Sequence, residues 1–181
     1  MQLTGKLLVA MPNLLDPNFY RSVVLVLEHD EEGTLGLVLN RKSALTTQEL
    51  SINQGLIWRG EGDAVRVGGP VQPTSLWVLY RDENPEIEAT CICRDCYLTT
   101  TLEGLSEVAD SAGSVRMVLA GYAGWGEGQL EQELRDGAWL SITPDMDLVF
   151  ECQPSEMWGQ ALRTVGVEPG ALVSLQSGTL Q

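Results

Sequence analysis

The sequence has few cationic side chains and a single histidine. Eleven Lys and Arg residues stand against 25 Asp and Glu residues, which gives a formal net charge of −14 over 181 residues. A charge of this sign disfavours the phosphate backbone of nucleic acid and anionic membrane surfaces as partners. The basic residues are also scattered, and Arg41-Lys42 is the only adjacent pair. We therefore expect no direct nucleic-acid partner and no membrane partner; the sequence leaves oligomerisation open.

Long apolar runs and a secretory signal are missing as well. The aliphatic run Val23–Leu27 is far shorter than the roughly 20 residues that a membrane span needs. The apolar stretch 7–11 is too short for the apolar region of a signal peptide, and it stops at Pro12. We therefore expect a cytoplasmic location, where the four cysteines stay reduced unless they hold metal.

Familiar catalytic and cofactor motifs are also absent. The sequence contains no Gly-x-Ser-x-Gly elbow, no His-Glu-x-x-His pair and no Rossmann glycine fingerprint. Any histidine-based dyad would have to use His29. These absences lower the expectation of an enzyme, and we assign no catalytic residue, no metal ligand and no cofactor.

What is present is the composition of an ordinary globular protein. Hydrophobic residues make up 44% and charged residues 20% of the chain. The length predicts one domain that spans residues 1–181. Runs of β-branched and aliphatic residues predict strands at 6–11, 22–28, 34–39, 64–67, 76–80, 88–93, 97–99, 115–120, 139–143 and 147–151.

Helical patterns lie between these strands. Capping-box spacings at Thr46/Glu49 and Thr100/Glu103 predict the starts of two helices, and apolar spacing predicts two more, around 130–134 and 157–165. The segments 22–28 and 34–39 are apolar at successive positions, so we expect both to be buried on both faces. Their short polar connection favours a hairpin, and the whole pattern predicts an α+β fold with a largely antiparallel sheet.

The glycine-rich segment 121–128 is predicted to be a loop between a strand and a helix. Such a loop can offer backbone N–H groups to an anion. It lacks the Lys and Ser/Thr of a phosphate loop, however, and carries Glu127 in their place. Phosphate binding is therefore the least favoured of three interpretations; the other two are a tight turn that packs Tyr122 and Trp125 and a small-ligand groove beside Trp125.

Three cysteines lie close together as Cys91-x-Cys93-x-x-Cys96, and Cys152 is a fourth candidate thiolate. Four thiolates could hold zinc, but structural zinc sites usually use two Cys-x-x-Cys pairs and this chain has one. Strand alternation would place Cys91 and Cys93 on one face. We expect reduced, structural thiols and less than stoichiometric zinc; redox chemistry at Cys93 and Cys96 is the remaining alternative.

Four carboxylates surround His29 in the segment 28–32. On a strand, His29 would face away from Glu28 and Asp30, so these groups do not converge. Acid–base catalysis or metal binding would need partners from elsewhere in the chain. We expect a solvated acidic hairpin with His29 at its exposed mouth.

Several separate blocks of the sequence resemble the YqgE/AlgH family. The resemblance is collinear and covers nearly the whole chain. The blocks are Gly5–Pro12, Phe19, Arg21–Val24, Glu28–His29, Gly36–Arg41, Gly68–Val71, Gly121–Gly126 and Gln129–Glu131.

The resemblance implies a bacterial protein with a compact α+β domain, in which a twisted, largely antiparallel and barrel-like sheet is flanked by short helices. The family has no settled enzymatic activity, although one branch is named as a transcriptional regulator of alginate synthesis. The cysteine set is not part of the family pattern. The matched blocks indicate candidate ligand-binding positions at Arg21, His29, Asn40, Arg41, Gly69, Tyr122, Gly124 and Trp125.

Three functional hypotheses follow. The first is a non-enzymatic regulatory module that binds a protein or a small molecule. The second is a transcriptional regulator, which the family name supports and the net charge opposes. The third is an enzyme with an unrecognised site near His29, Asn40 and Arg41, and it requires these three side chains to converge in one cleft.

Overall fold

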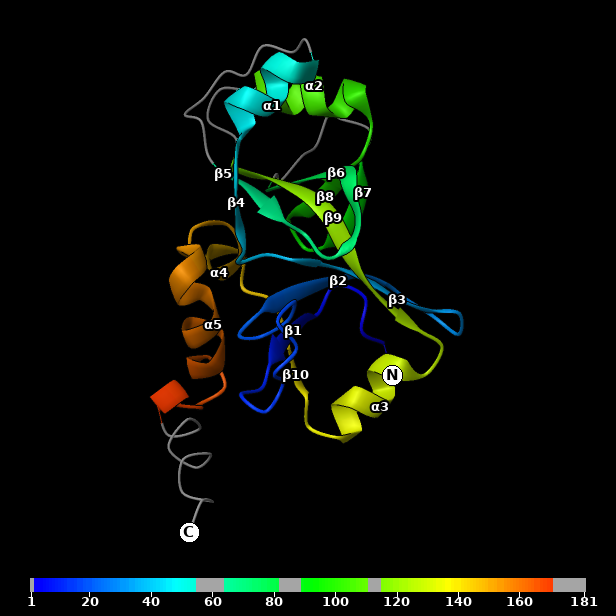
Figure 1. Ribbon diagram of the computed structural model, residues 1–181, viewed down its shortest axis with the longest axis vertical. Helices are drawn as coiled ribbons and strands as arrows, with labels where there is room; N and C mark the ends of the chain where they lie inside the picture. Colours follow the sequence, from blue (N-terminus) through cyan, green and yellow to red (C-terminus); the bar gives the residue numbers. More distant parts are fainter. Residues whose placement is uncertain (1, 55–63, 82–88, 111–114, 171–181) are drawn as a thin grey trace.

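The fold is built around a curled, ten-stranded sheet (Figure 1). The computed structural model describes residues 2–54, 64–81, 89–110 and 115–170. The main path of the sheet runs β10-β1-β2-β3-β9-β6-β8-β7, and β5 attaches β4 to β9. The strands are β1 (Leu7–Ala10), β2 (Val23–His29), β3 (Gly33–Val38), β4 (Lys42–Thr46), β5 (Ala64–Val67), β6 (Val71–Arg81), β7 (Thr90–Cys93), β8 (Cys96–Thr99), β9 (Arg116–Gly126) and β10 (Trp139–Ile142).

Strand pairing in the described residues is antiparallel, with the exception of the parallel pair β5–β9. The α+β class and the largely antiparallel sheet that the sequence predicts are therefore confirmed. The predicted strand at 88–93 begins at Thr90, and residue 88 lies outside the described residues.

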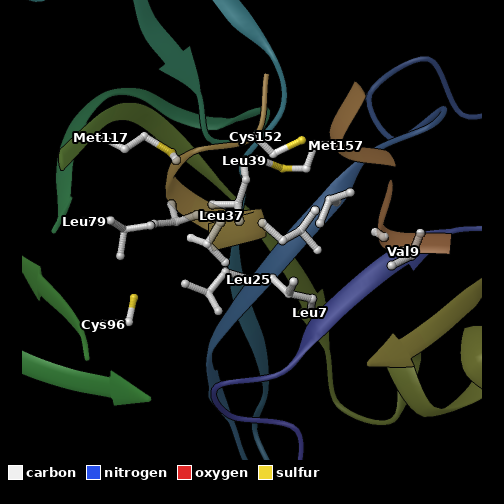
Figure 2. Packing of buried hydrophobic residues seen from close by; sticks show 14 of the residues in the cluster. Leu7, Val9, Leu25, Leu37, Leu39, Leu79, Cys96, Met117, Cys152 and Met157 are labelled. Carbon is white, nitrogen blue, oxygen red and sulfur yellow. The ribbon is translucent and has the colours of Figure 1, made fainter. Parts of the chain in front are cut away.

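The central strands are buried on both faces, as their continuous apolar runs predict. Val23, Leu25 and Leu27 of β2 belong to one core cluster, whereas Val24 and Val26 belong to a second cluster on the opposite face. This alternation follows from the two-residue period of a strand. Figure 2 shows the first cluster, where strand side chains meet those of the C-terminal helices.

Five short helices in the described residues cover the faces of the sheet (Figure 1). The helices α4 and α5 pack on the first cluster, and α3 packs on the second. The helices α1 and α2 cover a third cluster against β5, β6 and β9. Their bounds are α1 (Thr47–Gln54), α2 (Leu102–Asp110), α3 (Gln129–Arg135), α4 (Met146–Phe150) and α5 (Pro154–Arg163). None of the helices in these residues is long and apolar enough to cross a membrane.

One capping box forms as predicted and the other is shifted by one residue. The Glu49 carboxylate accepts hydrogen bonds from the backbone N–H of Thr46 at 2.9 Å and from its hydroxyl at 2.8 Å. These bonds hold the pKa of Glu49 below its usual range. At α2, the hydroxyl of Thr101 accepts the N–H of Gly104 at 3.0 Å, so the cap is Thr101 and not Thr100.

Two sequence predictions of secondary structure are wrong. The sequence pattern predicts a strand at 147–151, but residues 146–150 form α4, and the Asp145 carboxylate caps its start by accepting the N–H of Asp147 at 3.0 Å. The glycine-rich segment was expected to be a loop from Gly121 onward, but β9 continues to Gly126 and pairs with β3.

Close backbone crossing explains why this strand needs glycine. The segment 68–70 runs directly against β9, and a Cβ added to Gly69 would overlap the backbone of Tyr122. Gly69 has φ 157° and Gly121 has φ 74°, values that side chains disfavour. The glycines therefore allow the chain to return across β9 and to bring 66–70 beside Arg41 and Lys42.

Candidate functional site

Two like charges face one another on the strand pair β4–β5. Lys42 and Arg66 are directly opposite in the antiparallel register, so their side chains leave the sheet on the same face. Like charges in this position destabilise a strand pair. The arrangement is notable in a chain whose formal charge is −14.

A cavity of about 180 Å³, here named the inner cavity, lies beside this pair. Three cationic side chains line it, those of Lys42, Arg66 and Arg116. Among the described residues of its lining, Glu151 is the one carboxylate, and it also lies 3.5 Å from Nη1 of Arg81. In the part of the lining that the structure describes, cationic side chains therefore outnumber carboxylates by three to one.

The wall of the inner cavity also contains polar groups that are protonated and uncharged. Thr47, the first residue of α1, is 3% exposed, and its hydroxyl oxygen is buried without a hydrogen-bond partner. Cys152 is buried beside it, and burial raises the pKa of this thiol, with Glu156 adding to the rise and Arg66 opposing it. The buried Thr47 hydroxyl is a donor that the fold leaves unused, which is costly unless it meets an acceptor.

Lys42 also lines a larger hollow of about 490 Å³, here named the outer groove. Arg41 and Asn18 are its other polar side chains. Arg41 donates from Nη2 to the carbonyl oxygen of Tyr20 at 3.1 Å, whereas its Nε is buried without a partner. The remaining lining is Pro17, Val38, Val67, Gly69 and Pro70.

Asn40 fixes the segment that leads into the site. Its side-chain oxygen accepts the N–H of Val23 at 3.0 Å, and its nitrogen donates to the carbonyl oxygen of Arg21 at 2.9 Å. Arg21 has φ 52°, and its guanidinium lies 5.1 Å from the ring centroids of Tyr20 and Trp158. The structure thus brings Arg21, Asn40 and Arg41 together, with Asn40 in a positioning role.

His29 lies away from this group, at the hairpin end of β2. The side chain of Asn40 accepts the N–H of Val23, at the other end of β2. Val23 and His29 are six residues apart on the strand, and at about 3.3 Å per residue they lie about 20 Å from one another. The three side chains that the enzyme hypothesis needs therefore do not converge. The expected exposed position of His29 is also wrong, because its side chain is 7% exposed.

The surroundings of His29 explain this burial. Its Nδ1 lies 2.7 Å from the hydroxyl of Thr34 on the partner strand, and its Nε2 lies 3.6 Å from the Glu131 carboxylate of α3. The acidic residues 30–32 of the hairpin are exposed, as predicted. The imidazole faces away from them and toward α3, a packing partner that the local sequence does not show.

Trp125 lies in an aromatic cluster of the second core. Its ring stacks on Phe19 with centroids 5.7 Å apart and meets Trp139 edge-on at 5.8 Å. Its indole nitrogen donates to the Glu133 carboxylate at 3.0 Å. Tyr122 meets Trp77 edge-on at 6.0 Å, and Gly124 is exposed on β9. The tight packing of Tyr122 and Trp125 is what the structure shows; ligand contact by these residues stays a prediction.

Sequence reasoning missed Arg66, Arg116 and Thr47. Arg66 comes beside Arg116 because β5 pairs with β9 in parallel, with Arg66 opposite Leu119. Arg66 also donates to the carbonyl oxygen of Leu39. The basic residues look scattered along the chain, yet the fold gathers four of them, Arg41, Lys42, Arg66 and Arg116, around two adjoining hollows.

Comparison with known proteins places the chain in a family. The AlgH-like family (DUF179) matches residues 7–170. A UPF0301 protein of Myxococcus xanthus is 43% identical over 169 residues, which cover 92% of this chain and 93% of that protein. A UPF0301 protein of Ruegeria pomeroyi is 37% identical over 184 residues, which cover 98% of this chain and 99% of that protein.

Two solved structures share the fold. The solution structure of the AlgH protein from Pseudomonas aeruginosa aligns with a TM-score of 0.76 at 32% identity and covers 99% of this chain and 95% of its own. A crystal structure of a Corynebacterium diphtheriae protein aligns with a TM-score of 0.77 at 25% identity, covering 95% and 90%. The resemblance indicated by the sequence blocks is therefore confirmed, and the chain belongs to the AlgH-like family.

Proposed function

We propose that this protein is a non-enzymatic regulatory module that binds a small anionic molecule through Arg41, Lys42, Arg66 and Arg116. The observation that carries the proposal is the direct opposition of Lys42 and Arg66 across β4–β5. An anion between these side chains would add an attractive contact to each of the two cations.

The sizes of the two hollows suggest how such a ligand divides between them. The inner cavity, at about 180 Å³, is smaller than a typical ligand pocket of roughly 300–1,000 Å³. It suits one anionic group, a phosphate or a carboxylate, held by Lys42, Arg66 and Arg116. The outer groove, at about 490 Å³, has a mixed lining whose apolar part, from Pro17, Val67 and Pro70, suits the body of the ligand.

Two unused donors support this division. The Thr47 hydroxyl in the wall of the inner cavity and the Arg41 Nε in the outer groove are both buried without partners. Small movements of either side chain would let it donate to a ligand oxygen. Because Thr47 is the first residue of α1, ligand binding would hold this helix against β4 and β5. We propose that ligand binding fixes the position of α1 in this way, and that a partner protein binds the surface that α1 forms.

A thermal-shift titration of the full chain tests the proposal. Inorganic phosphate and citrate should each raise the melting temperature, and glucose should not. Lys42→Gln should weaken phosphate binding roughly tenfold or more, because a hydrogen bond to a charged group contributes about 1.5–3 kcal/mol. Arg94→Gln is the matched control, since it removes one positive charge from a side chain that is 95% exposed.

Two results would refute the proposal. One is a melting temperature that neither anion changes. The other is equal phosphate binding by the wild-type chain and by Lys42→Gln, which would place the anion elsewhere on the surface.

A further inference from the structure

Cys93 and Cys96 face one another across the tight hairpin β7–β8. They are register partners, and only Arg94 and Asp95 separate them. Asp95, the second residue of the turn, has φ 59°, and a left-handed conformation at this position is found in type II turns. The Cα atoms of directly opposite residues lie about 4.5 or 5.5 Å apart in the two types of antiparallel pair. Both values fall within the range of about 4.4–6.8 Å that a disulfide spans.

The two thiols differ in exposure and in acidity. Cys93 is half-buried, whereas Cys96 is fully buried in the first core cluster. A hydrogen bond from the Cys96 thiol lowers the pKa of Cys93, and the same bond together with burial raises the pKa of Cys96. Cys93 is therefore the thiol that ionises first, and Cys96 keeps its proton beside it.

Cys93 is also reachable from solvent. It lines a hollow of about 390 Å³ together with Gly5, Lys6, Thr143 and Met146. Lys6 donates to the Thr143 hydroxyl at 3.0 Å on the rim of this hollow. A small-molecule disulfide can approach Cys93 from this side, while Cys96 stays buried in the core.

We propose that Cys93 and Cys96 form a reversible dithiol–disulfide pair that exchanges with small-molecule disulfides of the glutathione class. The thiolate of Cys93 attacks one sulfur of oxidised glutathione, and one glutathione leaves as a thiolate that takes up a proton. The Cys96 sulfur then loses its proton and attacks the Cys93 sulfur, which releases the second glutathione. Two protein thiols are oxidised to one disulfide, and one glutathione disulfide is reduced to two thiols.

The other two cysteines have no part in this exchange. Cys91 is exposed, but its register partner is Tyr97, and its sulfur lies 3.4 Å from the carbonyl oxygen of Cys93. Cys152 lies at a separate edge of the core cluster from Cys96 (Figure 2). The four thiols therefore do not gather as a tetrahedral zinc set would require. The exchange is independent of the anion site, which uses none of the hairpin residues.

Equilibration of the full chain in glutathione buffers of graded redox ratio tests the proposal. After acid quenching and alkylation, peptide mass spectrometry should find a Cys93–Cys96 disulfide whose fraction rises with the oxidised share and falls again on reduction with dithiothreitol. Cys96→Ser should instead trap glutathione on Cys93, because the resolving thiol is gone. Cys93→Ser should leave Cys96 without glutathione, and Cys91→Ser should behave as the wild type.

Several results would overturn the proposal. Cys96 that stays fully alkylated at every redox ratio would show that no internal disulfide forms. A disulfide between Cys91 and either Cys93 or Cys96 would show that the reactive pair is a different one. A Cys93–Cys96 disulfide that dithiothreitol does not reduce would show that the pair is not reversible. About one zinc per chain in the reduced protein, lost in Cys93→Ser, would replace the redox pair with a metal site.

Discussion

Glu133 of α3 is the residue whose replacement tests the second core cluster most sharply. One oxygen of its carboxylate accepts the indole N–H groups of Trp125 at 3.0 Å and of Trp139 at 2.7 Å. The other oxygen accepts the side-chain N–H of Gln129 at 2.9 Å. Trp125 is 5% exposed and Trp139 is 3% exposed, so water cannot replace the carboxylate freely.

The cost of Glu133→Ala follows from the two orphaned indole donors. A buried donor that loses its partner costs about 1–3 kcal/mol, so two such donors cost about 2–6 kcal/mol. A central loss of about 4 kcal/mol corresponds to a fall in melting temperature of about 8–16 °C for a chain of this size. Glu133→Gln keeps a carbonyl oxygen that can accept both indole N–H groups, so we expect a loss well below that of Glu133→Ala.

Urea unfolding followed by tryptophan fluorescence measures this effect. Glu127→Ala is the control, because Glu127 is exposed just before α3 and should change the free energy of unfolding by less than about 0.5 kcal/mol. A loss below about 1 kcal/mol for Glu133→Ala would refute the reasoning. It would mean that the two indole N–H groups find other acceptors when the carboxylate is removed.

Three further predictions concern other parts of the molecule. His29→Asn should lower the free energy of unfolding by about 1–3 kcal/mol in urea titrations, since the buried Thr34 hydroxyl would lose its partner. Gly69→Ala should lower the yield of folded protein or its melting temperature, because the added Cβ overlaps the Tyr122 backbone; unchanged stability would show that 68–70 can move away from β9. Labelled duplex DNA should show no sub-micromolar binding by fluorescence anisotropy at about 150 mM salt, given the net charge of −14.

The part of the fold that the sequence predicts well is the part that depends on local patterns. Continuous apolar runs correctly indicated that β2 and β3 are buried on both faces. The sequence predicts a strand where α4 lies, because a segment of only five residues is too short to distinguish the 3.6-residue period of a helix from the two-residue period of a strand. The Asp145 cap, which follows Pro144, was the available local signal for a helix.

The candidate site could be predicted only in part, because it depends on distant pairing. Arg41 and Gly69 were identified by the family blocks, and both line the outer groove. Arg66 joins Arg116 only through the parallel pairing of β5 with β9, and no periodicity in the sequence indicates that pairing. His29 was placed in solvent for the same reason, since its contact with Glu131 comes from a helix about a hundred residues later.

Native mass spectrometry of the chain purified from its own cells under low salt tests the central claim most directly. The account predicts one small anionic molecule per chain, carrying a phosphate or carboxylate group, which is displaced by added inorganic phosphate and is absent from Lys42→Gln. A neutral or cationic bound molecule, equal occupancy in Lys42→Gln, or a chain that binds no anion even with phosphate added would contradict it.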